Sequence, residues 1–210
     1  IYVTLMLLCS CLMAQPTITS STVLAKGESA PIKFGTGYWA PGGAGANQNW
    51  DFSAAPSSDG WNWQIFDPET TAFKDSFPSA TMAFRLPQGD TAAVWEYYRF
   101  VNDSLSFLGA ASVLLQDSTS FYQILEDDPD VVATFPFTFG SSHADVKSGV
   151  QWINAGGMLF EQTRYGETQR TVDAYGTLIT PYGTFNNVVR VKTTESIRDT
   201  LQVFIPVETR

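Results

Sequence analysis

The sequence has few of the residues on which many small folds and many enzymes depend. It contains two cysteines, Cys9 and Cys11, and one histidine, His143, among 210 residues. Both cysteines fall in an apolar segment at the start of the chain, so the remainder has no disulfide and no thiolate. A zinc site of the usual histidine and cysteine type is therefore not expected there. The fold must be stabilised by burial of apolar side chains, which make up 44% of the sequence.

Basic residues are also few and scattered. There are 12 Lys and Arg against 21 Asp and Glu, giving a formal net charge of −9, and Arg190 with Lys192 is the densest basic pair. Such a chain would be repelled by nucleic acid and by anionic membrane surfaces, so neither is expected as a partner. An acidic surface is typical of solubility outside the cell.

The start of the sequence is uncharged up to Lys26. Residues 5–13 form an apolar run of signal-peptide length, and Ala14 is a small residue suited to cleavage after it. The run is shorter than the ~20 residues that span a bilayer. We therefore predict that residues 1–14 are an export signal whose basic start is missing. A buried core helix and a lipid anchor on one of the two cysteines are the alternatives.

Cleavage near Ala14 leaves residues 15–210, which we expect to form a single domain that is incomplete at its C-terminal end. The expected location is secreted or at the outer cell surface, and the export machinery is then one partner. No membrane span is expected in the mature chain, because no later apolar run approaches ~20 residues.

Alternation of residues on two faces predicts β-strands through most of the chain. Trp61, Trp63 and Ile65 share one face, and residues 93–100 and 188–195 alternate in the same way. Turn residues recur at intervals of roughly 8–12 residues, and no window sustains a helical period. The pattern predicts an all-β fold, an antiparallel β-sandwich of the jelly-roll or immunoglobulin-like kind.

Several turns are predicted from local chemistry. Pro181 and Gly183 suit a type I turn, and Gly176 in the preceding strand indicates a bulge or a close approach of another backbone. Asn102-Asp103 and Asp199-Thr200 are further turn pairs. The acidic run Glu126–Asp130 is typical of a solvated turn before a strand.

Two longer segments resemble recurring elements of a known group of proteins. PGGAGANQNWDFS (residues 41–53) and DAYGTLITPYGTFNNVVRVKT (173–193) resemble elements of large secreted proteins from bacteria that use type IX secretion. FPSATMAF (77–84) and FPFTFG (135–140) extend the similarity over most of the chain. The resemblance implies an exported β-rich domain without catalytic residues to carry over. Proteins of this group often carry a C-terminal sorting domain, and no such domain is present in this sequence.

Four triplets match the sites at which some of these bacteria attach O-linked glycans, namely Asp followed by Ser or Thr and then by an apolar residue or Thr. Short Asp-Ser and Asp-Thr pairs are also what turns require, so a turn without any glycan is the alternative. The candidate acceptors are Thr91, Ser104, Ser118 and Thr200.

The acidic run also raises the question of calcium, which prefers oxygen ligands from loops. Asp127, Asp128 and Asp130 are the candidate ligands, although their spacing does not match an EF-hand loop. No other cofactor is expected.

Catalytic signals are sparse. Residues 35–40 match a dinucleotide-binding fingerprint, but Pro41 follows, and no helix can continue through it to hold a pyrophosphate. Ser142 and His143 are adjacent, so in an extended chain they point to opposite faces and do not converge as a catalytic pair. We interpret His143 as a solvated loop residue. The alternative is a hydrolase, which would need a distant serine as the partner of His143 and would place His143 or a carboxylate pair in a concave pocket.

Other side chains leave two alternatives. A glycosidase needs two facing carboxylates, and the sequence cannot show whether any two of Glu96, Glu161 and Glu167 face each other. Trp61 and Trp63 would stack on sugars if exposed, whereas burial would make them core residues, which we favour.

The sequence therefore predicts a non-enzymatic chain, an exported structural or adhesive module of a larger surface or secreted protein. The alternative is a carbohydrate-binding module beside a hydrolase domain outside this sequence, which would make a polysaccharide the partner. Exposure of Trp61 and Trp63 is the feature that would favour it.

Overall fold

The structure is a computed structural model that describes residues 15–35, 37–88, 92–114, 117–155 and 158–204. The predicted export signal and Thr91 lie outside these residues. The described chain is mostly β-strand, with three short 3-10 helices, η1 (Ser20–Thr22), η2 (Pro68–Thr70) and η3 (Lys74–Ser76). The strands are β1 (Thr17–Ile18), β2 (Ser29–Gly35), β3 (Gly45–Asp51), β4 (Ser57–Phe66), β5 (Met82–Gln88), β6 (Ala92–Val101), β7 (Ser104–Leu114), β8 (Asp117–Thr134), β9 (Phe137–Thr138), β10 (Ser142–Ala155), β11 (Met158–Thr180) and β12 (Gly183–Phe204).

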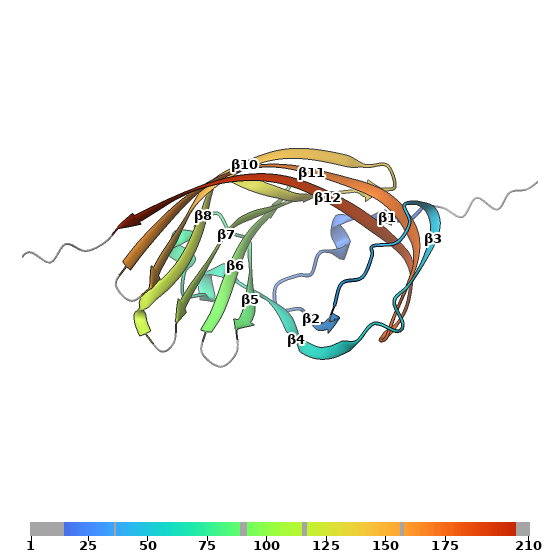
Figure 1. Cartoon of the computed structure of the whole chain (residues 1–210), viewed down its shortest axis with the longest axis horizontal. Coiled ribbons are helices and arrows are strands. Elements are labelled where there is room, and N and C mark those ends of the chain that lie inside the picture. Colours follow the sequence, from blue (N-terminus) through green and yellow to red (C-terminus); the bar gives the residue numbers. More distant parts are fainter. Residues whose placement is uncertain (1–14, 36, 89–91, 115–116, 156–157, 205–210) are drawn as a thin grey trace, which may run out of the picture.

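Ten strands form one open sheet in the order β12-β11-β10-β8-β7-β6-β5-β4-β2, with β3 beside β11, and β1 pairs with β9 separately. Neighbouring strands are antiparallel except β3 and β11, which are parallel. In Figure 1 the long strands β10, β11 and β12 arch over the N-terminal segment, and β5 to β8 fan out below them. The predicted all-β, antiparallel, sandwich-like class is confirmed, with most strands belonging to a single curved sheet.

The middle of the sheet is packed on both faces. We call the face that carries Phe84, Tyr98 and Arg170 the inner face, and the opposite one the outer face. On the outer face the segment with η2 and η3 covers a cluster that includes Phe77, Tyr97 and Leu108. The rings of Phe77 and Tyr97 stack with centroids 4.1 Å apart, and Tyr97 is fully buried. Because β6 alternates bulky side chains on both faces, it contributes to apolar packing on each side of the sheet.

A second cluster lies on the inner face. Ile65, Met82 and Phe84 form it, and Val23 and Leu24 of the N-terminal segment pack against it. This cluster holds the start of the described chain beneath the arch, which is why the N-terminal segment runs inside the curve in Figure 1.

Two of the predicted turns are present. Asn102 and Asp103 connect β6 and β7 with φ angles of 51° and 57°, which suits the two-residue turns that match strand twist. Pro181 and Tyr182 connect β11 to β12, and Gly183 follows.

Two other turn predictions were wrong. Asp199 and Thr200 lie within β12, because the Asp199 carboxylate binds the Arg164 guanidinium on β11 instead of its own backbone. The acidic run Glu126–Asp130 is part of β8, where Asp130 is buried and ion-paired. In both cases a partner distant in sequence satisfies a side chain that would otherwise favour a turn.

Candidate functional site

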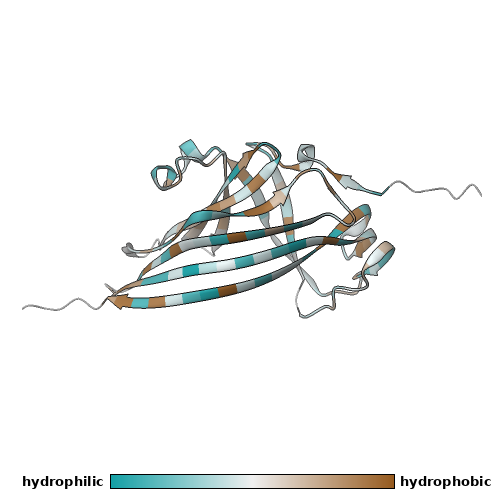
Figure 2. Ribbon diagram, turned by 90° about the horizontal axis from the view of Figure 1, so that it is seen from above, coloured by the Kyte–Doolittle hydropathy of each residue, from teal (hydrophilic) through white to brown (hydrophobic). Residues whose placement is uncertain are grey.

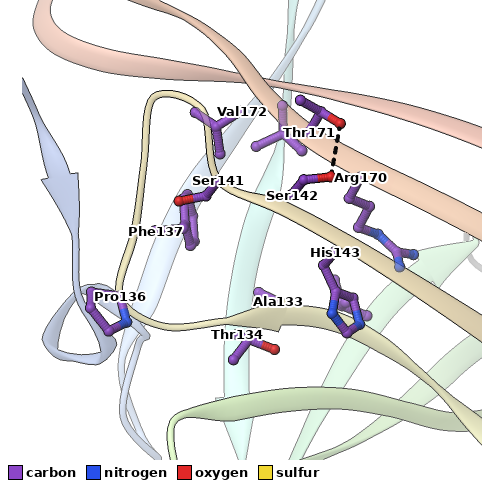
Figure 3. Close-up of a pocket in the computed structure, with 12 residues that line it drawn as sticks. Ala133, Thr134, Pro136, Phe137, Ser141, Ser142, His143, Arg170, Thr171 and Val172 are labelled. Atoms are coloured by element: carbon purple, nitrogen blue, oxygen red, sulfur yellow. Dashed lines mark hydrogen bonds between the residues drawn. The ribbon is translucent and has the colours of Figure 1, made fainter.

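A pocket of about 350 Å³ opens at the end of the sheet where β8 runs into β9 and β10 (Figure 3). Residues from β8, β10, β11, β12 and the loops around β9 line it. Ala133, Phe137 and Val172 give it apolar walls, and His143 and Arg170 are its main polar groups. The pocket therefore combines a small apolar cavity with two nitrogen-bearing side chains.

His143 belongs to β10 and lines this pocket, so its interpretation as a solvated loop residue was wrong. Its Nε2 atom is buried and has no hydrogen-bond partner in the described part of the chain. The neighbouring hydroxyls are engaged elsewhere. Ser141 Oγ accepts from the Thr138 N–H at 3.0 Å, and Ser142 Oγ accepts from Gln169 Nε2 at 2.6 Å. Neither of these two hydroxyls is hydrogen-bonded to the Nε2 atom of the imidazole, as the nucleophile of a triad would be.

The acid two residues after His143 does not orient it either. Asp145 Oδ2 accepts a hydrogen bond from the Val131 N–H at 2.6 Å, across from β10 to β8. This carboxylate serves strand pairing. In the part of the chain that the structure describes, neither Ser142 nor Asp145 is thus paired with His143 as in a hydrolytic triad.

A buried ion-pair network lies beside the pocket and joins four strands. Asp130 on β8 accepts from Arg170 Nη2 at 2.8 Å and from Lys147 Nζ at 3.3 Å, and Lys147 also pairs with Glu195 on β12. Arg170 Nη1 donates to the Val131 carbonyl at 2.9 Å. Burial works to raise the pKa of Asp130, but Arg170 and Lys147 outweigh it and the pKa is lowered. The network fixes Arg170 at the pocket wall.

The calcium candidates do not converge. Asp127 and Asp128 are exposed, whereas Asp130 is buried and occupied by two cations. Among the residues that the structure describes, no group of three or more His, Cys, Asp or Glu side chains is placed to hold a metal ion.

The candidate carboxylates are on different faces of the sheet. Glu96 is half-buried on the inner face, and burial raises its pKa, partly offset by the hydrogen bond that the Tyr98 hydroxyl donates at 3.1 Å. Glu161 accepts from Trp152 Nε1 at 3.1 Å and, like the exposed Glu167, lies on the outer face, because odd-numbered residues of β11 point outward there. None of the three faces another.

Glu126 was not singled out by the sequence, yet it is the more unusual carboxyl group. It lies on the inner face of β8, and burial raises its pKa to about 7 against the opposing charges of Lys147 and Arg164. The same burial raises the pKa of Tyr122. The alternation of residues 122, 124 and 126 was the signal that could have placed these side chains together on the inner face.

The sequence left two roles open for Trp61 and Trp63, stacking on sugars and packing in the core. Both side chains are half-buried. Trp63 packs against the inner cluster, with its ring centroid 4.5 Å from that of Phe84. More exposed aromatic surface lies in the loop between β2 and β3, where Tyr38 is 90% and Trp39 42% exposed.

The candidate glycan acceptors differ in exposure. Ser104 is half-buried at the start of β7, and Thr200 is exposed within β12, opposite Thr163. The side chain of Ser118 and the whole of Thr91 lie outside the described residues.

The segments 41–53 and 173–193 form one structural unit. β3 lies parallel to the end of β11, with Trp50 opposite Leu178. Arg190 donates to the carbonyl oxygens of Pro41 at 3.0 Å and Gly42 at 2.8 Å, and its guanidinium lies 6.0 Å from the Trp50 ring. These residues hold β3 and its preceding loop against β11 and β12 at one end of the curved sheet, so their regular pattern serves the fold.

β12 is a long, exposed edge strand of the sheet. It pairs with β11 along its 22 residues, and within the described chain nothing pairs with its other edge. Residues 191–204 are all exposed. Figure 2 shows the long strands at this edge of the sheet from above, with apolar and polar residues alternating along them. A strand edge of this kind offers a row of unpaired N–H and C=O groups.

Comparison with protein families, with curated proteins and with solved structures found no match for this chain. In the described residues, no helix has the length and apolar character needed to cross a membrane.

Proposed function

We propose that the chain is a non-catalytic structural or adhesive module of an exported protein, and that it attaches to a partner protein along β12. The observation that carries this proposal is the exposure of residues 191–204 on a strand with one free edge. Adding a strand to a free edge is a common way for β domains to bind extended segments.

The contrast between the two edges of the sheet supports the proposal. β2, at the other edge, has 7 residues and contains Pro31, and both short length and proline protect an edge from pairing. β12 has 22 residues and no proline. An edge left this long and open is suited to pairing with another chain.

Export is supported by sequence pattern. Residues 1–14 have the pattern of an export signal, and the segments 41–53 and 173–193 resemble elements of secreted proteins. A non-catalytic role is supported by the engagement of Ser142 and Asp145 away from His143.

Two proline variants test attachment along β12. Adjacent residues of a strand point their N–H groups to opposite edges, so of Thr193→Pro and Thr194→Pro one disrupts pairing with β11 and the other removes only an outward donor. Thermal unfolding identifies the variant that keeps its stability. We expect that variant to lose retention on bacterial cells that carry their native surface proteins, while the wild-type protein is retained until protease strips those proteins. Equal retention of the stable variant would refute attachment along β12.

A second candidate function is carbohydrate binding, favoured by the exposed Tyr38 and Trp39 between β2 and β3. Flat aromatic side chains stack on sugar rings. The matched test is affinity electrophoresis in polysaccharide gels. Retardation that is lost in Trp39→Ala and kept in the β12 proline variant would support a carbohydrate-binding module in place of strand addition.

A further inference from the structure

We infer that the partner strand on β12 is an acidic extended peptide, with two carboxylates six residues apart on one face and apolar side chains on the other. This inference rests on the proposed attachment along β12 and specifies the chemistry of the partner. It follows from the charges that β12 leaves unpaired in a chain whose net charge is −9.

The acidic residues of β12 are already neutralised on the inner face. Glu195 pairs with Lys147 of β10, and Asp199 accepts from Arg164 of β11 at 3.0 and 3.3 Å. Both carboxylates are therefore held back toward the sheet. They leave little negative charge to act on a strand that pairs with the free edge.

The basic residues of the exposed part of β12 are in the opposite situation. Lys192 and Arg198 lie on the outer face, opposite Thr171 and Tyr165 of β11, and neither is within ion-pair distance of a carboxylate among the described residues. The charge of Lys192 helps to lower the pKa of Asp173, but the two residues do not form an ion pair. A strand of this length places the two cations about 20 Å apart. The free charge along the edge is thus positive.

The neighbouring charges limit where the partner's carboxylates can lie. Glu167 of β11 is exposed on the same face, opposite Ser196, between the two cations. A partner carboxylate at that position would be repelled, whereas carboxylates beside Lys192 and Arg198 would be attracted. The expected partner is therefore acidic at these two positions and neutral between them.

The inner face supplies the apolar part of the match. Val191, Ile197, Leu201 and Val203 alternate with the outward cations and are all exposed, Leu201 by 61%. Valine or isoleucine on the partner would pack beside them, since cross-strand pairs of this kind stabilise a sheet. An alternating acidic and apolar strand satisfies both faces at once.

A second copy of the chain fits this edge poorly. Residues that face each other across two antiparallel strands lie on the same face of the sheet. Within residues 188–204, the outer-face positions, all even-numbered, include Arg190, Lys192 and Arg198 but no acidic residue. Two β12 strands would therefore place these cations beside neutral or basic side chains, so a different, acidic chain is the expected occupant.

The experiment uses a synthetic extended peptide written to oppose residues 191–203, with valine opposite the four apolar residues, glutamate opposite Lys192 and Arg198, and threonine elsewhere. Its control has lysine in place of both glutamates. We expect the glutamate peptide to bind the purified protein at least about tenfold more tightly than the lysine peptide at low salt, with the difference falling as salt screens it. The double variant Lys192→Glu/Arg198→Glu should reverse the preference.

Two N-methylated forms of the glutamate peptide, one methylated at odd and one at even positions, separate this inference from attachment itself. In each form one edge of the peptide cannot donate hydrogen bonds, so strand addition predicts that one form binds and the other does not. If that holds but both charge types bind equally, attachment stands and the acidic partner is refuted. If no peptide binds, or both methylated forms bind alike, attachment along β12 is itself refuted.

Discussion

Arg190 on β12 and Asp173 on β11 form a bidentate ion pair, with both the Nε–Oδ1 and the Nη2–Oδ2 distances at 2.8 Å. The remaining Nη1 group of Arg190 donates to the carbonyls of Pro41 and Gly42. One guanidinium therefore ties together the two segments whose sequence pattern is most regular. The pair lowers the pKa of Asp173 and raises that of Arg190, in each case through the shared hydrogen bonds first.

Replacing Arg190 by lysine should lower the free energy of unfolding by about 2 kcal/mol, because an ammonium cannot make the bidentate bond and also reach both carbonyls. Urea unfolding measures the loss. Arg198→Lys, at an exposed position without an ion pair, is the control and should change stability by less than about 0.5 kcal/mol. Equal effects of the two substitutions would show that Arg190 does not join the segments.

Gly176 on β11 lies against the backbone of Gln48 on β3, and a Cβ at this position would overlap the Gln48 backbone. The alanine variant must push β3 away, so we expect a loss of about 2 kcal/mol or more in stability. Gly35→Ala is the matched control, since its Cβ would meet only the Pro56 carbonyl oxygen at 3.8 Å. Comparable midpoints for the two variants in thermal unfolding would contradict close packing of β3 on β11.

The alternation of side chains along the sequence predicted a strand correctly where successive residues pack into clusters on the two faces of the sheet. Residues 93–100 alternate bulky side chains on two faces, and β6 indeed has an apolar cluster on each side. Gly176 was interpreted as a bulge or a site of close backbone approach. Both are present, since the register shifts beside Gly176 and the Gln48 backbone lies where a Cβ would be.

Strand length was not predictable in the same way. Asp199 is a turn former by local preference, yet it extends β12 because Arg164 binds it from 35 positions away. Asp130 is held in β8 by Arg170, 40 positions away. The same limit applies to the candidate pocket, since nothing near His143 in sequence indicates that Arg170 and Val172 complete its walls. Pairing between distant residues overrides local turn chemistry, and one sequence does not reveal it.

Asp130 anchors the network of Lys147 and Arg170, and it is 6% exposed. Asp130→Ala leaves Arg170 buried without its carboxylate, so we expect a loss of about 3 kcal/mol in the free energy of unfolding. Asp127→Ala, at an exposed position three residues earlier, is the control and should be near neutral. If Asp130→Ala were as stable as the control, the network would have no stabilising role.

Glu126 gives a pH-dependent prediction. Its pKa of about 7 in the folded protein exceeds the ordinary value of 4.5, chiefly because of burial. The folded state therefore holds the proton more tightly than the unfolded chain, and the stability that the proton contributes is complete below pH 4.5 and is lost as pH rises through about 7. Glutamine is neutral at every pH, so the Glu126→Gln variant does not become less stable in this way as pH rises.

The variant should match the wild-type protein near pH 4.5 and exceed its stability above pH 7, by on the order of 1 kcal/mol once solvent screening is allowed for. Urea midpoints measured across this range give the difference directly, and the acid-side loss from Asp130, Asp173 and Asp199 is common to both proteins. Asp128→Asn, at an exposed position of β8 whose charge does not act on Glu126, is the control for loss of a surface carboxylate. A Glu126→Gln difference that does not change with pH would mean that Glu126 is hydrated, and the inner face of β8 would then be open to solvent rather than closed beneath the arch of β10, β11 and β12.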